Sequence, residues 1–337
     1  MDMVEQWLWR QWSQRGPFAA AMFPLSLVYA GLATWKRNRL EDNQRSVFLP
    51  VKAVIVVGNL TVGGSGKTPM TAWLAQRLVK AGYRPGIVSR GYGRRHAQAS
   101  LLVRPGADPA MVGDEPLMLA RRTGVPVWVD RDRVRAARAL AEEEGVDVVI
   151  SDDGLQHHRL PRDISILMLD GRRRFGNGLC LPAGPLREPR SAAVRADFVV
   201  NMGGVPQPGE YAMDLAASDR VYSVARPGVG RPLREVVGRS AHAVAGIADP
   251  ERFFLALDDA GVDVIRHPFR DHHRFRARDI HFDDPYPVLM TEKDAVKCSG
   301  FADTRHWYWP VSAKPEPAFE RALLQRLETC IRLKYLG

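Results

Sequence analysis

A glycine-rich stretch near residue 60 carries the residue types that bind phosphate. In VVGNLTVGGSGKTPM (Val56–Met70), Lys67 and Thr68 directly follow four small residues, Gly63, Gly64, Ser65 and Gly66. Glycines let backbone N–H groups point at phosphate oxygens, a lysine can pair with the β- and γ-phosphates, and a threonine hydroxyl can ligate Mg²⁺. The strict pattern G-x-x-x-x-G-K-[ST] has a glycine where this chain has Thr61. We still predict a nucleotide-phosphate site rather than an empty glycine turn, because the glycines nearest the lysine form the tight turn.

Two carboxylates at the end of another apolar run can complete this site. Asp152 and Asp153 close the run VDVVISDD (Val146–Asp153). A carboxylate at the C-terminal end of a strand beside a phosphate loop can hold Mg²⁺ directly or through water. A strand that ends in Asp-Asp is by itself also an ordinary loop signal. Together with the glycine-rich loop, it predicts a metal site that includes Thr68.

Three further motifs hold charged side chains that suit acid–base or anion-binding roles. They are Asp114 in GDEP (113–116), Arg187 and Glu188 in LPAGPLREP (181–189), and Asp271, His272 and His273 in FRDHHRF (269–275). Asp114 can be a base or the N-cap of a helix, since aspartate is favoured at both places. The histidine loop can be a solvated surface loop, or it can present an imidazole that a carboxylate tunes.

Alternating apolar runs and helical segments would position these residues. The expected strands are 53–58, 84–92, 125–130, 146–153, 164–170 and 197–201, and the expected helices are 68–81, 115–123 and one that ends near 144. Unbroken apolar strands that alternate with helices are typical of a parallel sheet covered on both faces. We therefore predict the α/β class, with a mainly parallel sheet like that of the P-loop NTPases.

The stretch from residue 203 to residue 230 is rich in proline and glycine and predicts a domain junction. Beyond it we expect a strand, loop and amphipathic helix over 241–265, a strand over 287–296, a short strand over 306–313 and a closing helix over 317–336. The predicted organisation is a docking helix and linker (1–45), a nucleotide-binding domain (46–222) and a smaller α/β domain (223–337). The last helix can return to pack on the first domain.

The charge and the N-terminal segment point to an anionic partner. The 337-residue chain has a formal net charge of +10, which suits nucleic acid, an anionic membrane surface or a phosphorylated substrate. Its three widely spaced cysteines form no disulfide or zinc pattern, which favours a reducing compartment. From Pro17 to Trp35 the chain has no charged residue, and cations flank it on both sides. Because Pro24 and Gly31 weaken one continuous span, we predict a helix in the membrane interface rather than a full span or a buried core helix.

Two classes of phosphate-loop protein fit this chain poorly. A GTPase needs the guanine-reading N/T-K-x-D, and the nearest string, TEKD (Thr291–Asp294), has Lys293 directly before the aspartate. A partitioning ATPase places a signature lysine before the two glycines, where this chain has Val62. A kinase instead requires a group that accepts or orients the acceptor hydroxyl, together with cations for the transition-state charge.

The motifs as an ordered series resemble one family. VGNLTVGGSGKTP, SRGYGR, GDEPLMLA, SDDGLQHHRL, LPAGPLREP, FRDHHRF and TEKDAVK occur in this order over nearly the whole chain. The series resembles the tetraacyldisaccharide 4'-kinases, whose loop also lacks the first glycine. The resemblance implies transfer of the γ-phosphate of ATP, with Mg²⁺, to the 4'-hydroxyl of an acylated glucosamine disaccharide 1-phosphate, which gives lipid IVA in lipid A biosynthesis. It also implies docking at the cytoplasmic face of the bacterial inner membrane, with no nucleic acid and no required protein partner.

The resemblance further implies roles for individual residues. In the family the GDEP aspartate and the first histidine of the DHH motif act as a pair, which corresponds to Asp114 and His272, with His273 as the alternative. Lys67 would neutralise charge on the transferred phosphoryl group, and Thr68 with Asp152 or Asp153 would hold Mg²⁺. Weaker candidates for substrate contacts are Arg133, Arg187, Glu188 and Asp271. The alternatives are a kinase of another small-molecule or sugar-lipid acceptor and a membrane-associated partitioning ATPase.

Overall fold

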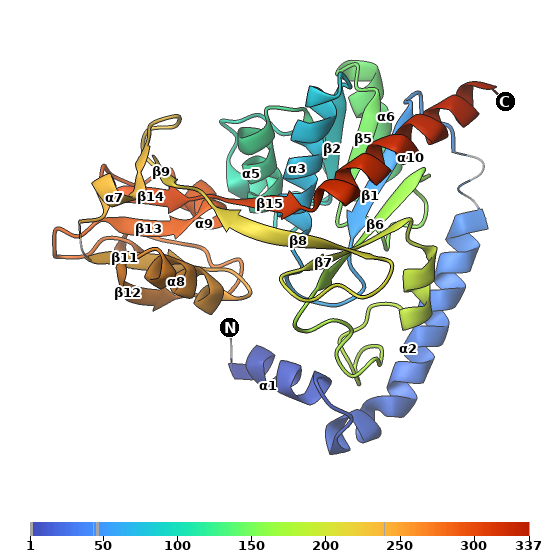
Figure 1. The fold of residues 1–337 in the computed structure, drawn as a ribbon, viewed down its shortest axis with the longest axis horizontal. Helices are drawn as coiled ribbons and strands as arrows, with labels where there is room; N and C mark the ends of the chain where they lie inside the picture. Colours follow the sequence, from blue (N-terminus) through green and yellow to red (C-terminus); the bar gives the residue numbers. More distant parts are fainter. Residues whose placement is uncertain (1–2, 43, 45–46, 239, 337) are drawn as a thin grey trace.

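The chain forms two lobes and a projecting N-terminal pair of helices (Figure 1). The computed structural model describes residues 3–42, 44, 47–238 and 240–336. The larger lobe is built on a nine-stranded sheet and the smaller lobe on a six-stranded sheet. The chain passes between the sheets twice in the described residues, between Ala217 and Arg220 and again between Trp309 and Val311.

The larger sheet is parallel except at its two edges. Its strand order is β15 (Val311–Pro315), β8 (Glu210–Ala217), β7 (Phe198–Met202), β6 (Ile164–Asp170), β1 (Ala53–Gly58), β5 (Val148–Asp152), β2 (Pro85–Ser89), β4 (Val127–Val129) and β3 (Leu101–Leu102). The pairs β15–β8 and β3–β4 are antiparallel, and the pairs between β8 and β4 are parallel. The predicted fold class is confirmed, and the phosphate loop follows the central strand β1.

Helices cover both faces of this sheet. Those of the larger lobe include α3 (Lys67–Lys80), α4 (Pro109–Val112), α5 (Asp114–Thr123), α6 (Arg133–Glu143), the 3₁₀ helix η2 (Arg190–Arg195) and the closing helix α10 (Pro317–Leu336). Because successive side chains of a strand point to opposite faces, Ile55 and Val57 of β1 join one core with Leu74 of α3, and Val54 and Val56 join another core with Leu140 of α6. Burial of both faces explains the unbroken apolar runs in the sequence.

The smaller sheet is also mostly parallel. Its strand order is β10 (Gly230–Pro232), β9 (Arg220–Ser223), β14 (His306–Trp309), β13 (Val288–Thr291), β11 (Ser240–Ala245) and β12 (Asp263–Pro268). Its helical elements are α7 (Leu233–Val236), α8 (Pro250–Asp259), η3 (Ala277–Asp279) and α9 (Glu292–Cys298). The chain passes from the larger sheet to the smaller sheet between β8 and β9. The domain boundary that we expected after residue 222 falls within β9.

Three predictions about elements need correction. The run 306–313 is two strands in different sheets, because Pro310 interrupts it and a proline has no N–H for the ladder. The run 287–296 is the strand β13 followed by helix α9, and the segment after α8 contains the additional strand β12. The closing helix α10 (Pro317–Leu336) has the predicted bounds, and its Phe319, Leu323 and Leu327 are buried in the core of the larger lobe.

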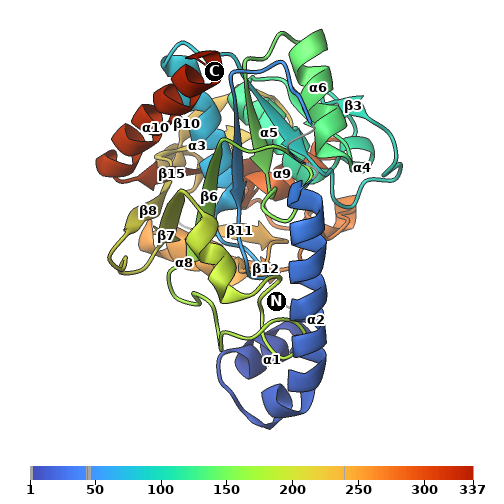
Figure 2. The same ribbon diagram turned by 90° about the vertical axis from the view of Figure 1, so that its right-hand side faces the viewer.

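The N-terminal helices are α1 (Met3–Trp12) and α2 (Pro17–Asp42), and α2 projects below the rest of the molecule in Figure 2. Pro24 and Gly31 weakened the case for one continuous span, but α2 runs through both residues as a single helix of 26 residues. Of the predicted linker, residues 36–42 are helical, and residues 43 and 45 lie outside the described part of the chain. By length and composition, residues Pro17–Glu41 are the one described helix that is long and apolar enough to cross a membrane.

Candidate active site

A cleft of about 1370 Å³ lies where the two lobes and α2 meet. The phosphate loop, the end of β5 and the start of α5 line it from the larger lobe. Asp271, His272 and Lys293 line it from the smaller lobe, and Tyr29 and Leu32 line it from α2. The cleft therefore brings together residues from all seven motifs of the ordered series, from Gly63 to Lys293.

The phosphate loop has the backbone conformation that its glycines predict. Gly66 precedes α3 with a φ of +75°, and a Cβ at Gly66 would lie 2.3 Å from Sδ of Met202. A larger residue would therefore be strained at this position both by its φ and by its neighbour. The N–H groups at the start of α3 face the cleft, which favours an anion there. Among the described residues no group pairs with the buried Oγ of Ser65, which leaves a donor for a phosphate oxygen.

Thr61 has a structural role that explains why glycine is not needed there. It forms an isolated antiparallel bridge with Leu186, and the backbones continue to pair on both sides. The Val62 N–H donates to the Pro185 carbonyl at 3.0 Å, and the Arg187 N–H donates to the Leu60 carbonyl at 2.7 Å. The LPAGPLREP loop is thereby attached to the phosphate loop, and this pairing places Arg187 beside the phosphate site.

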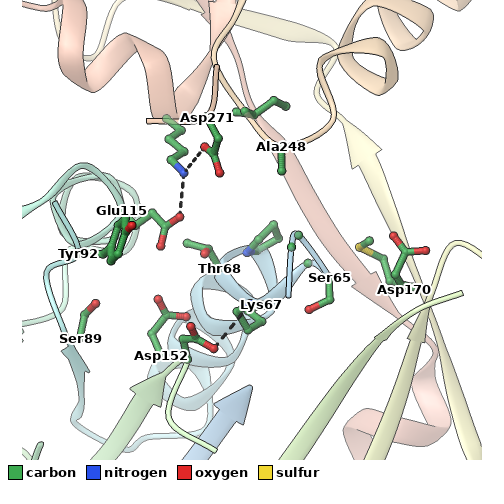
Figure 3. A pocket seen from close by; sticks show the side chains of 18 of the residues that line it. Ser65, Lys67, Thr68, Ser89, Tyr92, Glu115, Asp152, Asp170, Ala248 and Asp271 are labelled. Carbon is green, nitrogen blue, oxygen red and sulfur yellow. Dashed lines mark hydrogen bonds and ion pairs between the residues drawn. The ribbon is translucent and has the colours of Figure 1, made fainter. Parts of the chain in front are cut away.

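The predicted metal ligands surround the end of β5 (Figure 3). Asp153 lies 3.6 Å from Lys67 Nζ and 3.4 Å from Arg187 Nη1. Partial desolvation disfavours the charge on Asp153, but Lys67 and Arg187 outweigh it and lower the pKa of this carboxyl. Asp152 accepts a hydrogen bond of 2.9 Å from Thr71 Oγ1 and is almost fully buried. Burial, together with repulsion from Glu115 and Asp153, raises the pKa of Asp152 to about 7.

The buried carboxylate of Asp152, whose charge its neighbours do not offset, fits a divalent cation. Carboxylate and hydroxyl oxygens are the ligands that Mg²⁺ prefers, and Thr68 lines the cleft at the start of α3 beside Asp152 and Asp153. The side chains present therefore suit Mg²⁺ together with a nucleotide phosphate, and Asp152 and Asp153 are both placed to contribute.

Asp114 and His272 form a pair across the two lobes. Asp114 Oδ2 lies 3.1 Å from His272 Nδ1, although the residues are 158 positions apart. Asp114 is the first residue of α5, with Gly113 as its N-cap residue. Burial disfavours charge on Asp114, yet the bond to His272 and the field of Lys293 lower the pKa of the carboxyl to about 2. The hydrogen bond to Asp114 raises the pKa of His272 against the effect of burial.

The two adjacent histidines of the FRDHHRF loop point to different partners. His272 has a φ of +57° and lies with its ring 5.0 Å from that of Tyr92. Its backbone N–H donates to Asp271 Oδ1 at 2.9 Å. His273 instead lies 3.2 Å from Asp279 and packs among Phe269 and Phe275. The left-handed backbone at His272 turns its side chain toward the cleft, while His273 packs within its own lobe.

The weaker candidates fall into different positions. Arg133 lines the cleft with a nearly buried side chain and donates to the Asp130 and Asp152 carbonyls at 3.2 and 3.0 Å. Burial lowers the pKa of Arg133 to about 10. Glu188 forms a buried ion pair of 3.2 Å with Arg37 of α2 and lies 3.4 Å from His158. Arg133 thus fastens the end of β5, and Glu188 anchors α2.

Sequence reasoning did not find Lys293. Lys293 is the second residue of α9 and lines the cleft. It contacts Glu115, Asp271 and His272. Its motif, TEKD, lacks the spacing that guanine recognition needs, and as TEKDAVK it belongs to the ordered series. The available signal was a lysine inside a motif that belongs to the ordered series, but no local pattern shows which carboxylates a lysine will meet.

Comparison with known proteins decides the family. A family model described as "Tetraacyldisaccharide-1-P 4'-kinase" matches residues 18–328. The chain belongs to this family. A tetraacyldisaccharide 4'-kinase of Alkalilimnicola ehrlichii is 48% identical over 323 residues, which are 93% of this chain and 94% of that protein. One of Nitrosococcus oceani is 44% identical over 328 residues, or 96% of this chain and 95% of that protein.

A solved structure agrees with this family assignment. The crystal structure of LpxK from Aquifex aeolicus in complex with ATP matches with a TM-score of 0.77 and 28% identity, over 92% of this chain and 99% of that chain. The predicted family and kinase activity are confirmed. The family also accounts for the architecture, since its model extends from α2 into α10 and so includes both lobes.

Proposed function

We propose that this chain transfers the γ-phosphate of ATP to the 4'-hydroxyl of a tetraacylated glucosamine disaccharide 1-phosphate, which gives lipid IVA in lipid A biosynthesis. The names of the family and its relatives support the acceptor, and the ATP in the Aquifex aeolicus structure supports the donor. The observation that carries the proposal is the pair of Asp114 with His272, because this histidine lines the same cleft as the phosphate loop.

On the acceptor side Asp114 is the base. Its carboxylate is ionised at neutral pH, because its pKa lies at about 2. It accepts the proton of the 4'-hydroxyl as that oxygen attacks the γ-phosphorus and ADP leaves. His272 orients the carboxylate through the 3.1 Å contact between Nδ1 and Oδ2. Asp271 supports this loop, since its carboxylate accepts the His272 N–H.

On the phosphate side the loop and two cations bind the charge that develops during transfer. Lys67 and the N–H groups of residues 63–66 are placed to hold the β- and γ-phosphates. Arg187, 3.4 Å from Asp153, adds a second cation at this side. We assign Thr68 with Asp152 or Asp153 as the Mg²⁺ ligands. When bound there, Mg²⁺ supplies positive charge to the β- and γ-phosphate oxygens.

We propose that α2 docks the enzyme on the cytoplasmic face of the inner membrane. One set of its apolar side chains is exposed, namely Phe23, Leu25, Leu27, Val28, Leu32 and Trp35. Burial of such side chains in the interface, with nearby cations against anionic lipid, stabilises a docked helix. Leu32 also lines the cleft, so the membrane-facing surface continues into the acceptor site. This continuity suits an acceptor whose acyl chains remain in the bilayer.

The proposal is tested with the full chain in detergent micelles, ATP, Mg²⁺ and the tetraacylated disaccharide 1-phosphate. We expect a bisphosphorylated lipid by mass spectrometry, with one ADP formed per product. A parallel reaction uses the same disaccharide without acyl chains. Equal rates on both acceptors would favour a kinase of soluble sugars, and ADP without a phosphorylated product would favour an ATPase. Either result would overturn the proposed acceptor.

A further inference from the structure

Lys293 contacts three side chains near the proposed base Asp114, namely Glu115, Asp271 and His272. Its Nζ is 3.0 Å from Glu115 Oε1, 3.0 Å from Asp271 Oδ1 and 3.3 Å from His272 Nε2. Its side chain is 14% exposed. In Figure 3 the dashed lines at Glu115 and Asp271 mark two of these contacts, which join the lobes across the cleft. The lysine is therefore held in place by carboxylates from α5 and from the histidine loop.

The charge state of Lys293 follows from these neighbours. Burial acts to lower its pKa, but Glu115, Asp271 and Asp114 outweigh burial and raise the pKa above that of an ordinary lysine. The side chain is thus an ammonium group at any pH at which the enzyme works. An ammonium group has three donors and no lone pair, so it can only donate in its contact with the imidazole.

We propose that Lys293 is a positioning residue that holds His272 in the neutral tautomer with its hydrogen on Nδ1. Because Lys293 only donates, Nε2 of His272 must present its lone pair to it. The ring hydrogen is then on Nδ1, which donates to Asp114 Oδ2 at 3.1 Å. This inference rests on the proposed role of Asp114 as the base.

The arrangement decides where the acceptor proton goes. With its hydrogen already on Nδ1, His272 can orient Asp114 but cannot take a proton from it through that atom. The 4'-hydroxyl proton is therefore carried by the Asp114 carboxyl. An imidazolium would also stabilise the carboxylate further and make it a weaker base, so a neutral His272 favours transfer.

The charged groups around His272 have opposite effects on its pKa, and their net effect raises it. Asp114 from α5 and Asp271 from its own loop favour the imidazolium, and Lys293 from α9 disfavours it. The ring of Tyr92 covers one side of the imidazole at 5.0 Å. Removal of Lys293 would leave Asp114 and Asp271 to raise the pKa of His272 without an opposing charge. The imidazolium should then persist to higher pH, and the activity that needs neutral His272 should begin at higher pH.

The test compares wild type with Lys293→Met by nitrogen NMR of the histidine-labelled full chain in detergent, without substrate. His272 is assigned by the signal that His272→Gln removes. Above the raised pKa of His272, we expect the neutral wild-type ring to carry its hydrogen on Nδ1, with Nε2 unprotonated. In Lys293→Met we expect Nε2 to remain protonated to higher pH. The acid limb of the kcat profile should move up by about one pH unit, so that kcat falls by up to about tenfold at pH values on that limb and less above it.

Two further variants separate positioning from a general structural effect. Lys293→Arg keeps the charge and the donors, so we expect it to retain the wild-type His272 signals and acid limb. Arg122→Met is the matched control, because the 2.7 Å pair of Arg122 with Glu292 joins the same two helices, α5 and α9. We expect it to lower the melting temperature without shifting the His272 signals.

A neutral wild-type His272 with its hydrogen on Nε2 would overturn the proposal, and this result is available even if Lys293→Met does not fold. Identical His272 spectra in wild type and Lys293→Met would also overturn it, as would an equal shift in Arg122→Met. The spectra are recorded without an acceptor. Failure to form a phosphorylated lipid would therefore count against the proposed function and would leave the tautomer measurement to decide separately.

Discussion

Asp152 lines the cleft and Asp114 contacts His272, which also lines it, yet the pKa values of these two buried aspartates are shifted in opposite directions. The pKa of Asp114 is lowered to about 2, because His272 and Lys293 outweigh the cost of its burial. The pKa of Asp152 is raised to about 7 by burial and by the acidic neighbours Glu115 and Asp153. Cations thus outweigh burial at Asp114, whereas at Asp152 burial and acidic neighbours outweigh the effect of Lys67. The difference indicates that a bound metal ion supplies the positive charge that Asp152 lacks.

The two sides also differ in how the chain builds them. The phosphate side comes mainly from strand ends and the loops that follow them, β1 with its glycine-rich loop and β5 with its two aspartates. The acceptor side combines the start of α5 with a loop and a helix of the other lobe. The first arrangement depends on local geometry, and the second depends on how the lobes pack. Four substitutions test the comparison, from the largest expected effect to the smallest.

Lys67→Ala should have the largest effect on turnover. It removes the ammonium group that neutralises the transferred phosphoryl group, so kcat should fall about 10⁴-fold. Initial rates of lipid phosphorylation measure the effect. Lys52→Ala is the control, since the pair of Lys52 with Asp147 at 3.0 Å is partly exposed and lies outside the cleft lining. Comparable losses in both variants would mean that Lys67 acts only through folding.

Asp114→Asn should lower kcat about 10³-fold with little change in the KM for ATP, because the amide cannot accept the hydroxyl proton. The variant should also melt at a lower temperature at pH 7. A lowered carboxyl pKa stabilises the fold above the unfolded pKa, and this contribution is lost as pH falls toward about 2.

The control for Asp114 is Asp108→Ala. Asp108 caps α4 by accepting the Ala110 N–H at 2.9 Å, so its loss should cost about 1 kcal/mol of stability without changing kcat. If Asp114→Asn behaved in the same way, Asp114 would be a structural residue of α5 and the assignment of the base would be wrong.

Arg37→Met examines a third buried carboxylate, Glu188, which has its own cations but no assigned part in the chemistry. Burial opposes the charge on Glu188, and His158 and Arg37 nevertheless lower its pKa. Removal of one partner of a buried pair should cost about 3 kcal/mol of unfolding free energy, measured by denaturant titration. Such a loss would show that the lowered pKa of Glu188, like that of Asp114, reflects pairing with cations. Of these two carboxylates, only Asp114 would also take part in catalysis.

The matched control is Arg195→Met, which removes another ion pair between α2 and the larger lobe. The pair of Arg195 with Glu41, at 2.7 Å, has side chains that are 53% and 32% exposed. It should contribute less than about 1 kcal/mol. Equal costs for Arg37→Met and Arg195→Met would contradict a special anchoring role for the buried pair.

Asp152→Asn should have the smallest effect on stability and the opposite sign. A raised carboxyl pKa means that its charge costs folding stability as pH rises from the ordinary value toward about 7. Without metal, the variant should therefore melt a few degrees above wild type at pH 8, with a smaller difference at pH 5. Addition of Mg²⁺ with ATP should raise the melting temperature of wild type more than that of the variant. If the variant were less stable than wild type at pH 8, the pKa of Asp152 would not be raised. The opposite pKa shifts of Asp152 and Asp114 would then be wrong.

The sequence predicts those parts of the molecule whose cause is local. The bounds of β6 and α10 agree with the expected 164–170 and 317–336, because apolar periodicity over a single element reports its burial. The glycine-rich loop between a buried strand and a helix is equally local, and it identifies the phosphate side. The ordered motifs added the family and hence the expectation that Asp114 and His272 form a pair.

The tertiary structure alone decides which distant groups meet. Pro310 directs two halves of one apolar run into different sheets, and Glu188 turns to Arg37 of α2 while its neighbour Arg187 faces the phosphate site. Lys293 lies 178 positions from Glu115 and 21 from His272, yet it contacts both. Periodicity and spacing fix the direction of a side chain within its own element. Contacts between elements depend on how whole lobes pack, so the network that sets the charge of the acceptor side exists only in the folded chain.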